Sequence, residues 1–119
     1  MNQLLDLQKR ADDVEAAIVA ADGELETMRL DVARARGYCD GMRRCVEAIR
    51  HAFTNPSAVE MQAVAAVLAR VQPMLEESEA KLQAIEETYN LKQQQLDDKM
   101  VDLAILEQQI ASQEAAVDL

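Results

Sequence analysis

The sequence has very few of the residues from which compact, sheet-rich folds are built. Among its 119 residues there are no Trp, one Phe, two Tyr, three Gly and two Pro. So few turn-forming residues argue against a multi-stranded sheet, and so few aromatic side chains argue against a compact globular core. The 20 alanines and the 50% apolar content instead favour long helices that pack closely along their sides.

Other absences exclude further classes of protein. No apolar run approaches the roughly 18 residues of a transmembrane helix, and six charged residues among the first 20 exclude a secretory signal. Cys39 and Cys45 lie six positions apart in a helical pattern, about 9 Å along the helix axis, which is too far for a disulfide. We therefore expect reduced thiols, an intracellular (cytoplasmic) location and no membrane partner.

The sequence also offers no set of side chains for catalysis or metal binding. His51 is the sole histidine, so no pair of histidines can form. A catalytic set of nucleophile, histidine and acid would depend on this one residue. Cys39, Cys45 and His51 recur at six-residue spacing, which places them on different faces of a helix and argues against a metal site. We expect no enzyme activity, no cofactor and no small-molecule substrate.

The dominant pattern is a heptad repeat, whose positions are labelled a to g. Every a position from Leu4 to Phe53 and every d position from Leu7 to Ile49 is apolar. Sustained over seven heptads, this pattern predicts a left-handed supercoiled seam formed by the a and d residues. A second repeat has apolar residues at every a position from Met61 to Val117. Its d positions are interrupted by Ser78, Lys92, Lys99 and Gln113.

A short break separates the two repeats. Asn55 precedes Pro56, which disfavours helix, and Ser57 followed by Glu60 has the spacing of a capping box. We therefore expect a single coiled-coil domain over residues 1–119. Its parts are a helical arm at 3–53, a turn at 54–57 and a second arm at 58–118 with a kink near residue 73. The alternative at Pro73 is a separate short helix over residues 58–72.

These patterns predict the fold class: all-α, a long antiparallel coiled-coil helical hairpin. We expect two such hairpins to assemble into a four-helix bundle through their turn ends. A straightened turn, giving an extended domain-swapped dimer, is the alternative, and the choice between dimer and tetramer stays open. The heptads run almost to Leu119, as expected for a segment of a longer coiled coil, although a short natural protein is also possible.

Two groups of residues are candidates for interaction. The first, which we call the apolar tip, lies around the turn in a stretch that is apolar on almost every face. It consists of Phe53, Val59, Met61, Val64, Val67, Leu68 and Val71. The second, the arginine ladder, occupies successive e positions: Arg29, Arg36, Arg43 and Arg50. Folding the arms together is expected to bring Glu79 near Arg36 and Glu86 near Arg29, as in an antiparallel coiled coil.

The function we expect is a non-enzymatic scaffold or oligomerisation module, part of a larger structural or cytoskeletal assembly, with itself and other helical proteins as partners. One alternative is an intracellular chaperone or export-stalk-like adaptor that holds a client helix at the apolar tip. The other is binding of nucleic acid or a microtubule by the arginines. The net charge of −10 disfavours this last reading because it repels polyanions.

The helix–turn–helix layout is similar to the stalk-like coiled-coil hairpins of type III secretion and flagellar export. It is also similar to the arms of prefoldin subunits, but residues 54–74 contain no pattern for the β-hairpins that prefoldin has between its helices. Segments of long cytoskeletal, centriolar and kinetochore scaffold proteins look similar too. The resemblance covers length and layout and implies a docking, spacing or adaptor role.

Overall fold

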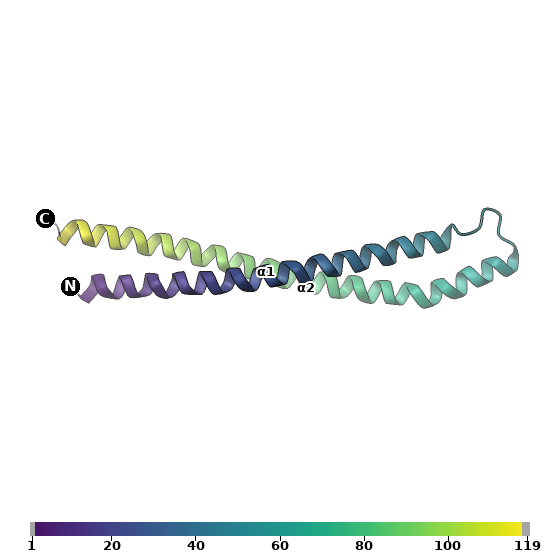
Figure 1. Ribbon diagram of the computed structural model, residues 1–119, viewed down its shortest axis with the longest axis horizontal. Helices are drawn as coiled ribbons and strands as arrows, with labels where there is room; N and C mark the ends of the chain where they lie inside the picture. The colour runs from purple at the N-terminus through teal and green to yellow at the C-terminus, as the bar shows by residue number, and fades with distance from the viewer. Residues whose placement is uncertain (1, 118–119) are drawn as a thin grey trace. The chain divides into compact units, whose positions relative to one another are not determined.

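The computed structural model describes residues 2–117, and these form two long helices. Helix α1 spans Asn2–Arg50 and helix α2 spans Ala58–Val117, with a single connection between them (Figure 1). The described residues contain no strand. The predicted all-α class and the helical hairpin are confirmed. Residue 118, the last residue of the predicted second arm, lies outside the described part of the chain.

Helix α1 ends three residues before the predicted boundary at residue 53. The amide of His51 donates to the carbonyl of Glu47 at 3.1 Å, and the amide of Ala52 donates to the carbonyl of Ile49 at 3.3 Å. The first of these hydrogen bonds spans four residues and the second spans three. Helices often end with such a tighter final turn. Phe53 therefore lies in the connection rather than in the helix.

The start of α2 has the predicted capping box. The Ser57 amide donates to Oε1 of Glu60 at 3.3 Å, and the Glu60 amide donates to the Ser57 hydroxyl at 3.2 Å. The two residues satisfy each other's amides, which otherwise have no partner at a helix N-terminus. The amide of Met61 then donates to the Ser57 carbonyl at 2.9 Å and begins the regular helix.

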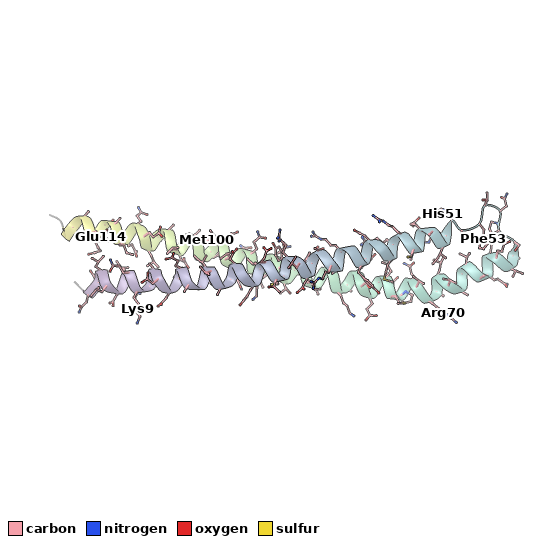
Figure 2. The ribbon with its side chains drawn as sticks, viewed as in Figure 1. Lys9, His51, Phe53, Arg70, Met100 and Glu114 are labelled. Atoms are coloured by element: carbon pink, nitrogen blue, oxygen red, sulfur yellow. The ribbon has the colours of Figure 1, made fainter. Side chains whose placement is uncertain are left out.

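Pro73 lies inside α2 without ending it. The helix is continuous from Ala58 to Val117, so a separate helix over residues 58–72 does not form. Figure 2 shows α2 changing direction close to Arg70, three residues before the proline. Proline has no N–H to donate to the carbonyl four residues earlier, that of Ala69, and its ring crowds that carbonyl, which is an established cause of helix bending.

The hairpin consists of two compact units, which we describe separately. The terminal unit combines residues 2–28 of α1 with residues 88–117 of α2. The turn unit comprises residues 29–87, including the connection. The most buried side chains are Ala11, Leu25 and Leu96 in the terminal unit and Val32, Cys39, Val46 and Leu75 in the turn unit. All of them occupy a positions of the heptads, so the heptad pattern predicted the core.

The polar residues at d positions of α2 stay in the seam. Ser78 is partly buried, and its hydroxyl donates to the Met74 carbonyl at 2.9 Å and lies 3.6 Å from Sδ of Met42. Lys92 is also partly buried, and its ammonium group is paired with the carboxylate of Glu24 at the edge of the seam. Each polar group thus finds a partner while its aliphatic part covers the core.

The predicted pairing of the two arms is wrong by one heptad. Arg36 pairs with Glu86, and Arg43 pairs with Glu79, whereas the sequence had placed Glu79 near Arg36 and Glu86 near Arg29. The cause lies at the turn: seven residues connect the helices, and the first turns of α2 extend past the end of α1 (Figure 1). Each residue of α2 is therefore opposite a residue of α1 that lies closer to the turn than expected.

Within the described residues, neither helix contains a stretch that is both long and apolar enough to cross a membrane.

Candidate protein-interaction site

The apolar tip residues come together around the connection of the turn unit. Phe53 contributes from the connection (Figure 2). Met61, Val64 and Leu68 contribute from successive turns of α2. Together with Arg50, Pro56 and Ala65 they line a shallow groove of about 270 Å³. The groove exists because α2 begins beyond the last turn of α1, so its first apolar residues have only the connection to pack against.

The remaining tip residues lie outside this groove. Val59 has 75% of its surface exposed, and Val67 is also exposed, whereas Val71 is partly buried. Met61 occupies an a position, yet it is 59% exposed, unlike a residues further along α2. The hairpin thus leaves open Phe53 in the connection and Met61, the first a position of α2.

The tip is also almost free of charge. Between residues 51 and 73 the only Asp, Glu, Lys or Arg residues are Glu60 and Arg70. The Glu60 carboxylate is occupied by the amide of Ser57 in the capping box. Exposed apolar surface without charges around it is typical of a protein-binding surface.

The arginine ladder is used within the chain. The Nε atoms of Arg36 and Arg43 lie 3.1 Å from Oε1 of Glu86 and Glu79, respectively, and Arg43 also reaches Asp40 at 3.1 Å.

The hydrogen bond with Glu79 is the main cause that raises the pKa of Arg43. Arg50 pairs with Glu47 at 3.6 Å, and Arg29 also has an interaction partner within the chain. The pairs of Arg36 and Arg43 with glutamates of α2 join the two helices of the turn unit along one side, whereas Arg50 pairs within α1.

A second groove, which sequence reasoning missed, lies on the turn unit between the two helices. Its volume is about 580 Å³, and Tyr38 and Met74 form its exposed apolar part. The other residues that line it are Arg34, Ala35, Cys39, Glu77, Ser78, Lys81 and Ile85. The available signal was in the g positions: in α1 the residues at 38 and 45 are Tyr and Cys, and in α2 those at 67 and 74 are Val and Met.

The terminal unit offers a groove of different character. It has a volume of about 690 Å³ and is lined mostly by polar side chains near the open end of the hairpin. These residues are Gln3, Asp6, Leu7, Arg10, Ile105, Gln108, Gln109, Ser112 and Gln113. This groove therefore differs from the one at the tip mainly in the polar side chains of its lining.

No group of three or more His, Cys, Asp or Glu residues suited to a metal ion occurs in the described chain. Cys39 is buried and Cys45 exposed, and both are free thiols. His51 is exposed, with Nε2 lying 3.4 Å from a carboxylate oxygen of Glu47.

No protein-family model matches this chain, and no curated protein or solved structure is significantly similar to it. Its function must therefore be argued from its own residues, and the apolar surface of the turn unit is the feature that needs explaining.

Proposed function

We propose that this chain is a non-enzymatic scaffold: an antiparallel coiled-coil hairpin that uses its turn unit to associate with itself and with other helical proteins. The observation that carries the proposal is the uncharged apolar tip, which neither helix covers. The two free thiols fit a reducing compartment such as the cytoplasm.

The coiled-coil part of the proposal rests on the pairing of heptad positions. Buried residues occupy a positions, the d positions are partly buried, and both long-range arginine pairs join an e position to an e position. Pairing between e positions is expected when two helices of an antiparallel coiled coil flank a shared seam.

The interaction part rests on exposed apolar area. Burying a side chain the size of Met or Phe stabilises an assembly by about 1.5–3 kcal/mol relative to leaving it in water. Phe53, Val59 and Met61 together form a surface from which a partner could gain several such contributions. Their uncharged surroundings mean that covering them desolvates few ionised groups.

Two other candidates were considered. A chaperone or adaptor that holds a client helix is favoured by the groove at Phe53, Met61 and Leu68, because a groove lined by apolar side chains suits the apolar face of a helix. Polyanion binding is disfavoured, since Arg36 and Arg43 already pair with carboxylates of the opposite helix.

The proposal is tested by measuring mass in solution from low micromolar to millimolar concentration. The wild-type chain of 13.2 kDa is expected to form dimers or larger species. Met61→Glu should weaken association at least about tenfold, because it places a charge in the contact. Val101→Glu in the terminal unit is the matched control, since Met61 and Val101 are both 59% exposed, and it should leave association unchanged.

A wild-type chain that stays at 13.2 kDa throughout this range would overturn the self-associating scaffold. A fluorescent probe of apolar surface then distinguishes the client-holding alternative. Strong binding that Met61→Glu abolishes and Val101→Glu preserves would favour a client at the tip, whereas no binding would exclude one.

A further inference from the structure

The heptad of α2 nearest the connection is packed differently from the rest of the seam. Met61 occupies the a position of this heptad and is 59% exposed, and Phe53 in the connection is 43% exposed. In the middle of the turn unit, the a residues Val46 and Leu75 are only 3% and 6% exposed. The helices therefore bury their a residues where they run side by side and leave those at the connection open.

The register of the turn unit accounts for this difference. The hydroxyl of Ser78 lies 3.6 Å from Sδ of Met42, so these two d positions face each other across the seam. Met61 lies 17 residues before Ser78 and would therefore face a position about 17 residues after Met42. Because α1 ends at Arg50, only eight residues after Met42, the first turns of α2 extend past it.

A slide of α2 along α1 by one heptad, about 10 Å, would bring these turns back over α1. Met61 would then face Phe53 at the next a position of the first arm, and Val64 would face Ile49 at a d position. Phe53 joins α1 if the last turn of the helix continues by three residues, and two of their amides already donate to carbonyls of α1. The slide therefore converts open tip residues into another layer of the seam.

The e side of the turn unit accepts either register. The residues of the arginine ladder recur every seven positions, and Glu79 and Glu86 are also seven residues apart. A slide of one heptad moves Glu79 from Arg43 to Arg36, and it moves Glu86 from Arg36 to Arg29. Since every a position of both arms is apolar, the a layers of the seam stay apolar as well.

The terminal unit carries the contacts that differ between the registers. Lys92 pairs with Glu24, and one heptad nearer the N-terminus of α1 the corresponding residue is Ala17, which has no carboxylate. Leu7 and Gln113, both partly buried, line the same groove, and the slide would move Gln113 past the beginning of α1. The second register thus loses an exposed ion pair and a layer with a polar residue, and it gains an apolar layer at the tip. Exposed ion pairs are weak, so small terms separate the two registers.

We propose that the hairpin has a second register, one heptad from the first, in which Phe53 and Met61 bury each other and close the apolar tip. We call the register of the structure open and the second one closed. A partner that binds the tip selects the open register, and the ion pair between Lys92 and Glu24 also favours it. The existence of the closed register is independent of the proposed function, whereas its control of binding rests on the tip being the surface that associates.

Disulfide trapping distinguishes the registers, because a disulfide needs two Cα atoms within about 7 Å of each other. In a full chain whose two native cysteines are replaced by alanine, Ser78→Cys is combined with one further cysteine. With Met42→Cys it forms the open pair, whose positions face each other in the structure. With Ala35→Cys it forms the closed pair, whose positions meet after the slide. With Ile49→Cys it forms the reverse pair, whose positions would meet only after a slide in the opposite direction.

Under mild oxidation at low micromolar concentration, the open pair is expected to form its disulfide fastest. The closed pair should react more slowly, but at least about tenfold faster than the reverse pair. Ala35 and Ile49 are each seven residues from Met42, so fluctuations within the open register reach both, and motion at the end of α1 favours Ile49. Mass spectrometry confirms that each disulfide lies within one chain. A closed pair that forms no faster than the reverse pair would overturn the second register.

Two variants of the closed-pair chain test what closes the tip. Met61→Glu is tolerated in the open register, where the side chain is exposed, but places a charge against Phe53 in the closed one. It should therefore slow the closed-pair disulfide at least about tenfold. Val59→Glu is the matched control and should leave the rate unchanged, because Val59 is 75% exposed and its f position lies outside the seam in both registers. Equal slowing by both variants would overturn the contact between Met61 and Phe53.

A variant of the terminal unit tests the contact that favours the open register. Glu24→Gln removes the ion pair with Lys92 and should speed the closed-pair disulfide about threefold. Asp12→Asn changes an exposed carboxylate at a b position of the same unit and should leave the rate unchanged. If Glu24→Gln also leaves the rate unchanged, the ion pair does not hold the open register.

The locked chains separate this inference from the proposed function. With the closed-pair disulfide in place, self-association and binding of an apolar probe should be at least about tenfold weaker than with the open-pair disulfide. If both locked chains associate equally well, the register does not control the tip and that part of the proposal is wrong. If the closed pair forms no faster than the reverse pair while Met61→Glu still weakens association of the wild-type chain, the second register is wrong and the proposed function stands.

Discussion

The terminal and turn units are built from the same two helices but differ in charge. The described residues of the terminal unit include 12 acidic and four basic side chains, whereas the turn unit has nine acidic and eight basic ones. The seam differs as well: at d positions of α2 the terminal unit has Lys92, Lys99 and Gln113, and the turn unit has only Ser78 as a polar residue. The same heptad pattern therefore carries a strongly acidic terminal unit and a nearly neutral turn unit.

The placement of exposed apolar residues follows the same division. In the terminal unit they lie at b, c, e and f positions: Leu5, Val19, Leu91, Met100, Val101 and Ile105. In the turn unit Met61 lies at an a position, Phe53 lies in the connection, and three lie at g positions: Tyr38, Val67 and Met74. Scattered apolar side chains are ordinary on a surface, whereas a contiguous group beside an uncharged segment is not. This difference fits a turn unit that associates and a terminal unit that stays solvated.

The largest effect is expected from placing a charge in each core. Val46→Asp in the turn unit should lower the free energy of unfolding by about 3 kcal/mol, because Val46 is 3% exposed and no d position of the turn unit carries a lysine. Leu25→Asp in the terminal unit should cost less, since Lys92 already reaches the adjacent Glu24. Denaturant unfolding followed by circular dichroism measures both.

Asp12→Ala, on the exposed side of α1, is the control for these two variants and should change stability little. If Leu25→Asp lowers the free energy of unfolding as much as Val46→Asp or more, the lysines do not make the terminal seam more tolerant of charge.

Exchanging the seam residues between the units should give effects of opposite sign. Ile85→Lys puts a lysine at a d position of the turn unit and should destabilise the hairpin by about 2 kcal/mol, through lost apolar burial. Lys92→Leu should stabilise the hairpin by about 1 kcal/mol, because Glu24 is exposed and can return to water when its partner is removed. Thermal unfolding measures both variants. If both substitutions stabilise the hairpin, the turn-unit seam is not the one that depends more on apolar burial.

The sequence predicted the core of this hairpin better than its register. Leu25, Val46 and Leu96 are buried because their heptad positions fix which side of the helix they occupy, whatever the partner. The pairing of Arg43 with Glu79 depends instead on how many residues the connection uses and how far α2 extends past α1. A change of one heptad preserves the pairing of e positions, so periodicity alone does not choose between the two registers.

The candidate surface was likewise predicted in part. A stretch that is apolar on almost every face identified the tip. The sequence predicted that the first helix would include Phe53, but α1 ends at Arg50. The groove beside Tyr38 and Met74 was missed because its lining residues belong to two helices and become neighbours only when the hairpin forms. Which of them become neighbours also depends on the register of the two helices.

Glycine substitutions compare the units at a smaller scale. A Cβ on Gly23 in the terminal unit or on Gly41 in the turn unit would meet no atom within 4 Å. Each Gly→Ala change should therefore stabilise the isolated hairpin by about 1 kcal/mol at low protein concentration. Denaturant unfolding followed by circular dichroism measures both changes, and a loss of stability from either substitution would contradict open space at that position.

The smallest expected effect is a pH dependence that belongs to the terminal unit. The hydrogen bond from Lys92, together with the charges of Lys92 and Lys99, lowers the pKa of Glu24 below its ordinary value of 4.5. The unfolded chain then binds more protons than the folded chain, so this contribution is fully present above pH 4.5 and is lost as the pH falls through the lowered value.

Glu24→Gln should make the fall in stability below pH 4.5 shallower, as measured by thermal unfolding at a series of pH values. Lys92→Met should have the same effect, and combining the two should add nothing, because either change removes the same interaction. If the double variant shows a shallower fall in stability below pH 4.5 than either single variant, Lys92 is not the main cause of the lowered pKa of Glu24.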